Sequence, residues 1–72
     1  MGKSIHTNEY KVFVERLRRA RLEAGLTQVE AAKKVGRLQS HISNVESGQQ
    51  RVDIVELKRF AKLYGKSVSY FL

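Results

Sequence analysis

The fold is decided by residues 25–48, which read GLTQVEAAKKVGRLQSHISNVESG. Near the start of this stretch, Thr27 and Glu30 have the spacing of a capping box, in which each side chain accepts a hydrogen bond from the other residue's backbone amide. Apolar residues follow at helical spacing before Gly36, a residue that can take the left-handed conformation at a helix end. This part therefore predicts a short helix between Thr27 and Gly36.

A second helix is predicted from Gln39 to about Ser47, after a turn over residues 36–38. Ile42 and Val45 share one side of that helix and are expected to face the core. The other side then exposes polar residues, namely Gln39, Ser40, Ser43 and Asn44. Two short helices joined by a short turn that contains glycine form the layout of a helix-turn-helix motif.

Helical periodicity continues on both sides of this motif. A helix is predicted over residues 9–24, with an apolar stripe that only Arg21 interrupts. Another helix is predicted to start at Asp53, whose carboxylate can cap it, and to end at Gly65. A last short helix is predicted over residues 67–72, with Ser67 as its cap.

The chain as a whole is predicted to be an all-α domain of five helices. Proline is absent, and no stretch alternates apolar and polar residues for long enough to form a strand. A length of 72 residues suits one domain, which we assign to residues 1–72. Residues 1–8 are expected to form a flexible N-terminal segment.

Composition restricts the class of partner. Lys and Arg number 14 against 7 Asp and Glu, which gives a net charge of +7 and a pI near 10.2. This excess indicates a polyanionic partner, with nucleic acid as the leading candidate. Cysteine is absent and the two histidines are far apart, so we expect neither a metal site nor a cofactor. No apolar run could span a membrane or serve as a secretion signal, so we expect a cytoplasmic protein with no membrane partner.

The residues of the motif resemble the bacteriophage repressor and Cro-like helix-turn-helix family of the XRE type. The resemblance covers nearly the whole chain and rests on Gly25-Leu26-Thr27-Gln28, Glu30-Ala31-Ala32, Val35-Gly36, Gln39-Ser40, Ile42-Ser43 and Glu46-Ser47-Gly48. It implies a lambda-repressor-like domain that regulates transcription. Such a protein binds double-stranded DNA sequence-specifically, with its recognition helix, here about residues 39–47, in the major groove of an operator.

The resemblance also assigns residues that read bases. Gln39, Ser40 and Asn44 match base-contacting positions of the family. The chemistry agrees, because glutamine and asparagine amides can pair with the major-groove edge of adenine. His41 and Ser43 flank these residues and are further candidates for contacts to bases or phosphates.

Phosphate contacts and an ion pair are implied in the same way. The residues at family positions near the DNA backbone are Gln28, Arg18, Arg37, Ser47 and Arg51. Arg21 and Glu46 match an ion pair that joins the first helix to the recognition helix, which would explain the interrupted stripe. One departure from the family is Leu38, at a position where a Ser, Thr or Pro commonly begins the recognition helix, so we expect this helix to lack a side-chain cap.

A homodimer is predicted, because one short recognition helix reads only a few base pairs. The C-terminal segment carries more apolar side chains than one small domain can enclose: Val55, Leu63, Val68, Tyr70, Phe71 and Leu72. A dimer formed through the C-terminal helices would place two recognition helices about 34 Å apart, one turn of DNA. The operator would then be palindromic.

Functions other than DNA reading make different demands on the sequence. An enzyme needs a nucleophile, a base and an orienting group, and the sequence offers no such set, so we expect no catalysis. RNA binding would favour aromatic residues on the exposed face of the recognition helix, where there are none. An antitoxin-like module that binds a protein partner and regulates its own gene stays open as the alternative.

Overall fold

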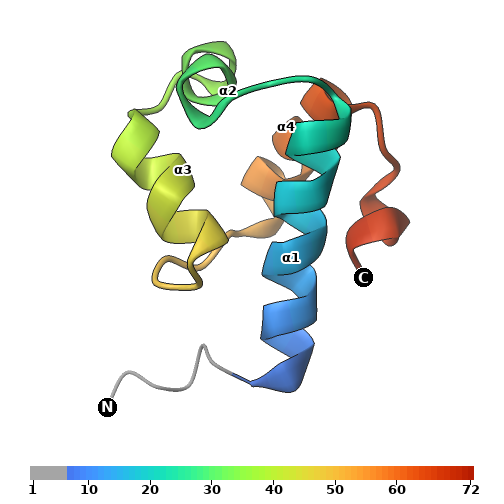
Figure 1. Cartoon of the computed structure of the whole chain (residues 1–72). Coiled ribbons are helices and arrows are strands. Elements are labelled where there is room, and N and C mark those ends of the chain that lie inside the picture. Colours follow the sequence, from blue (N-terminus) through green and yellow to red (C-terminus); the bar gives the residue numbers. More distant parts are fainter. Residues whose placement is uncertain (1–6) are drawn as a thin grey trace.

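The computed structural model describes residues 7–72 (Figure 1). Its helices are α1 (Asn8–Glu23), α2 (Gln28–Val35), α3 (Gln39–Glu46) and α4 (Ile54–Tyr64), followed by the 3-10 helix η2 (Val68–Phe71). No strand occurs within the described range. The all-α class is therefore confirmed, and the observed limits of α1 to α4 lie within about a residue of the predicted ones.

Side chains cap three of the four α-helices at their N-termini. These caps accept hydrogen bonds from backbone amides that have no partner within the helix. The Thr27 hydroxyl accepts from the Glu30 amide at 3.1 Å while the Glu30 carboxylate accepts from the Thr27 amide at 2.9 Å, so the capping box is formed. Asp53 accepts from the Glu56 amide at 2.8 Å at the start of α4. Gly36 ends α2 with a φ of 74°, a left-handed conformation that favours glycine.

The C-terminal element differs from the prediction. Residues 68–71 form a 3-10 helix in place of a fifth α-helix, closed by the bond from the Tyr70 amide to the Ser67 carbonyl at 3.1 Å. A segment this short favours the tighter i to i+3 pattern. The Ser67 hydroxyl does not cap it, because its partner is the Ser69 hydroxyl at 2.9 Å.

The expected flexible segment over residues 1–8 lies mostly outside the described residues. At its end, Thr7 accepts a hydrogen bond from the Tyr10 amide at 3.1 Å and caps α1, and Asn8 is the first residue of that helix. These two residues are therefore part of the folded domain.

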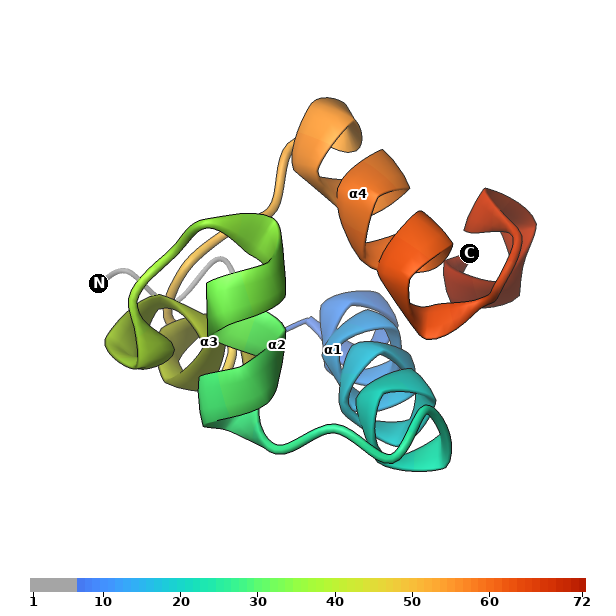
Figure 2. The same cartoon turned by 90° about the horizontal axis from the view of Figure 1, so that it is seen from above.

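The core joins all five elements. Its largest fully buried side chains are Leu17 of α1, Ile42 and Val45 of α3, Phe60 of α4 and Phe71 of η2. The two alanines of α2 are also fully buried, and their small side chains let α3 pack closely. Figures 1 and 2 place α3 and η2 on opposite sides of the molecule, so α3 is displayed at one edge.

Candidate nucleic-acid interface

One edge of α3 carries polar side chains that point away from the core. Gln39, Ser40 and Asn44 are exposed and Ser43 is half-buried, while Ile42 and Val45 hold the opposite side of the helix in the core. Amides and hydroxyls therefore occupy the edge that a partner can reach. Such groups both donate and accept hydrogen bonds, which is what the edges of DNA bases require.

The first residue of this edge is held by α2. The Gln39 side chain donates through Nε2 to Gln28 Oε1 at 2.9 Å, and Gln28 Nε2 donates to Glu46 Oε1 at 3.1 Å. Gln28 thus links the start of α3 to its last residue. Gln28 and Gln39, to which the family resemblance gives a phosphate contact and a base contact, are therefore joined by a hydrogen bond.

This series of hydrogen bonds ends at Glu46, which forms the expected ion pair with Arg21. The pair joins α1 to α3. Arg21 Nε lies 2.7 Å from Glu46 Oε2, and Arg21 Nη2 lies 3.0 Å from Oε1, so the contact is bidentate. Arg21 Nη1 also donates to the Leu26 carbonyl at 2.8 Å. The hydrogen bond to Glu46 raises the pKa of Arg21 although burial opposes it. With both side chains under a tenth exposed, each charge is satisfied by the other.

The N-terminal end of α3 is built differently. Leu38 occupies the cap position with 77% of its surface exposed, and it offers no side-chain acceptor. The His41 amide bonds instead to the Leu38 carbonyl at 3.0 Å. Leu38 therefore leaves this helix end without a side-chain cap.

His41 does not lie on the exposed edge, contrary to the expectation that it flanks the base-reading residues. Its ring is buried against α4, where Nε2 lies 3.0 Å from Glu56 Oε2 and Nδ1 lies 3.1 Å from Arg37 Nη2. Arg37 Nη1 also approaches Glu56 Oε2 at 3.4 Å. His41 precedes Val45 by one helical turn, so it shares the inward side of α3. Sequence reasoning did not identify Glu56 as a partner.

The remaining candidates for phosphate contacts lie apart from this network. The Ser47 hydroxyl donates to the Asn44 carbonyl at 3.1 Å just beyond α3, and Arg18 is exposed on α1. The Arg51 guanidinium lies over the Tyr10 ring, 5.2 Å from its centre. These three residues come from different segments of the chain.

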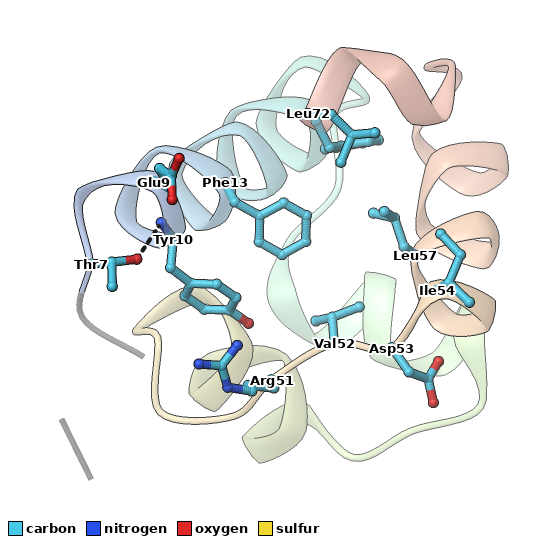
Figure 3. A pocket seen from close by; sticks show the side chains of 11 residues that line it. Thr7, Glu9, Tyr10, Phe13, Arg51, Val52, Asp53, Ile54, Leu57 and Leu72 are labelled. Atoms are coloured by element: carbon cyan, nitrogen blue, oxygen red, sulfur yellow. Dashed lines mark hydrogen bonds between the residues drawn. The ribbon is translucent and has the colours of Figure 1, made fainter. Parts of the chain in front are cut away.

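Arg51 and Tyr10 also line a groove between the start of α1, the loop before α4 and the C-terminal residue (Figure 3). Phe13, Val52 and Leu57 form much of its apolar wall. Leu72 stands on its rim and is largely exposed. The groove thus presents apolar side chains beside the C-terminal residue.

Two further properties concern the described residues only. Between residues 7 and 72, no helix is both long enough and apolar enough to cross a membrane. The same range contains no group of three or more His, Cys, Asp or Glu side chains that could hold a metal ion.

Comparison with known proteins assigns the family. A family model described as a helix-turn-helix domain matches residues 12–68, which include most of α1, all of α2 to α4 and the first residue of η2. A comparison with curated proteins found no match. A helix-turn-helix domain indicates DNA binding, in agreement with the exposed polar edge of α3 and the net charge of +7. This chain belongs to the helix-turn-helix domain family.

Proposed function

We propose that the protein is a sequence-specific regulator of transcription that inserts α3 into the major groove of double-stranded DNA. The observation that carries this proposal is the exposed polar edge of α3, whose first residue, Gln39, is fixed by Gln28. A fixed amide loses less conformational freedom on binding than a mobile one. The resemblance to phage repressors and Cro supports the same conclusion.

The proposed contacts fall into two groups. Gln39, Ser40, Asn44 and the half-buried Ser43 would read base edges, and His41 is left out because its ring faces α4. The phosphate backbone would be bound by Gln28, Arg18, Arg37, Ser47 and Arg51. Phosphate contacts fix the register of the protein on the duplex, whereas base contacts specify the sequence.

A homodimer completes the proposal. Phe71 is buried within the domain, but Val55 and Leu72 are exposed, and Leu63, Val68 and Tyr70 are half-buried. Apolar side chains that one copy leaves exposed can be covered by a second copy across a two-fold axis. Such an axis near the C-terminal end would let two copies of α3 meet successive turns of one face of the DNA.

Selection of bound sequences from a pool of random duplex DNA tests this function. We expect a palindrome whose half-sites are about 10 base pairs apart from centre to centre. The same selection with a Gln39→Ala, Asn44→Ala double variant serves as the control and should lose the preference. Binding with no enriched sequence would contradict specific reading, and an asymmetric site would contradict the dimer.

Sedimentation tests the oligomeric state independently. We expect dimers on the selected DNA, because each half-site would hold one copy. A monomer at high micromolar concentration, both free and on DNA, would contradict the homodimer while leaving DNA binding intact.

A further inference from the structure

Three polar side chains form a triangle at the N-terminal end of α3. Of these three, Arg37 alone is among the DNA contacts proposed above. The corners of the triangle are Arg37 from the turn, His41 from α3 and Glu56 from α4, and its three sides measure 3.1, 3.0 and 3.4 Å. His41 is 9% exposed. A buried ring with a partner at each nitrogen is a constrained arrangement, so its chemistry can be deduced from the partners.

The partners indicate which His41 ring nitrogen donates a hydrogen bond and which accepts one. An arginine guanidinium can only donate hydrogen bonds, so Nδ1 of His41 must accept from Arg37 Nη2 through its lone pair. An ionised carboxylate can only accept, so Nε2 must carry the proton that faces Glu56. These contacts match the tautomer that carries its hydrogen on Nε2. A protonated ring would present N–H groups on both sides and would lose the bond from Arg37.

The same contacts fix the guanidinium of Arg37. Its two terminal nitrogens are held by His41 and Glu56, although its side chain remains 44% exposed. A guanidinium has five N–H donors, so donors remain for a phosphate. Holding the planar group in advance lowers the entropy that Arg37 would lose on binding a phosphate.

We propose that His41 is a positioning residue for DNA binding, which acts by holding the Arg37 guanidinium beside the N-terminus of α3. The inference rests on the proposed function, because it needs Arg37 to contact a phosphate. It goes beyond that function in assigning a task to His41 and Glu56, neither of which is among the proposed DNA contacts. The simpler role, in which His41 only packs α3 against α4, predicts a different result in one experiment.

That experiment is a double-mutant cycle of His41→Leu and Arg37→Ala on DNA affinity. The probe is mixed-sequence duplex DNA of about 20 base pairs, long enough for two half-sites, at pH 8, where an ordinary histidine is neutral. Arg37→Ala should weaken binding, whereas Arg19→Ala, a matched change of an exposed arginine on α1, should weaken it less. His41→Leu should weaken binding by about two- to tenfold in the parent chain, the cost of leaving one side chain mobile.

In the Arg37→Ala background, His41→Leu should have almost no effect on affinity, because no guanidinium is left to position. His41→Gln should restore most of the parent affinity, since its amide can donate to Glu56 and accept from Arg37. If His41→Leu does not fold, as the denaturant midpoint would reveal, Glu56→Gln takes its place in the cycle.

Each remaining outcome overturns a defined claim. Equal decreases in affinity from His41→Leu with and without Arg37 would show that His41 acts through packing and would overturn the positioning role. If Arg37→Ala binds DNA as tightly as the parent chain, the positioning role of His41 is overturned. The proposed function is not affected by that result, because the parent chain still binds DNA. Failure of the parent chain to bind any duplex would overturn the proposed function itself.

Discussion

The two ends of α3 are attached to the domain in opposite ways. At the C-terminal end, the Glu46 side chain is 6% exposed and shares a bidentate ion pair with the Arg21 side chain, which is 7% exposed. At the N-terminal end, Leu38 provides no cap, and the Arg37 side chain, 44% exposed, is held by His41 and Glu56. Charged side chains thus form an enclosed contact at one end and an open one at the other.

With the proposed function, this difference would separate stability from DNA recognition along one short helix. An enclosed pair has little exposed surface to offer a ligand, but removing either partner leaves a buried charge unsatisfied. An open end contributes less to stability, while its polar groups can exchange water for phosphate and base contacts. We therefore expect changes at the C-terminal end to lower the free energy of unfolding, and changes at the N-terminal end to lower DNA affinity.

The largest expected effect is the decrease in stability caused by Arg21→Ala or Glu46→Ala. Each variant leaves one charge without its partner in a buried position, so the free energy of unfolding should fall by about 3 kcal/mol. Urea denaturation followed by circular dichroism measures this change. Midpoints equal to that of the parent would show that the pair is solvated and would remove the contrast between the two ends of α3.

A second ion pair of this chain provides the control. Lys66 Nζ lies 2.8 Å from Glu23 Oε1, close to the 2.7 Å of the Arg21–Glu46 contact, but both side chains reach solvent. Water compensates the loss of either charge, so Lys66→Ala should shift the midpoint only slightly. A shift as large as that of Arg21→Ala would mean that burial does not decide the effect.

The next largest effect concerns Gln39→Ala at the open end. A base-reading amide should contribute about 1 to 3 kcal/mol of affinity on the selected site, and its removal should relax preference at one symmetric position. Stability should change by less than about 0.5 kcal/mol, because the side chain is exposed. Fluorescence anisotropy on selected and random duplexes measures the difference. Equal decreases in affinity for both would mean that Gln39 positions the protein and that Ser40 and Asn44 read the sequence.

Arg51→Ala is the contrasting variant for a phosphate contact. It should weaken binding to selected and random DNA together, because a phosphate carries no sequence information. It should also reduce the slope of log affinity against log salt by about 0.9 for each phosphate that is no longer neutralised. An unchanged slope would remove Arg51 from the interface.

The sequence predicts the helices for reasons that are local, whereas the ion pair between Arg21 and Glu46, which lie 25 residues apart, is implied only by the family resemblance. Thr27 and Asp53 cap helices through bonds to residues three positions ahead, and Arg21 stands out because it interrupts an apolar stripe. The burial of His41 also had a local signal, since it lies one turn before Val45. The pairing of His41 with Glu56 had no such local signal, because 15 residues separate the two and only the folded arrangement of α3 and α4 brings them together. The same holds for the bond from Gln39 to Gln28, which depends on how α2 crosses α3.

The smallest expected effect tests whether the open end of α3 can be strengthened. Leu38 already has the extended backbone of a cap residue, with φ −81° and ψ 153°, and its side chain is exposed, so Leu38→Ser should fit without strain. The serine hydroxyl would accept from an amide in the first turn of α3, and such a cap should raise the free energy of unfolding by about 1 kcal/mol. Leu38→Ala is the matched control, because it removes the same apolar surface without adding an acceptor. Urea midpoints should rank the serine variant above the alanine variant. Equal midpoints would mean that the bond from the His41 amide to the Leu38 carbonyl already satisfies this end of the helix. The absence of a side-chain cap would then not lower the stability of the open end.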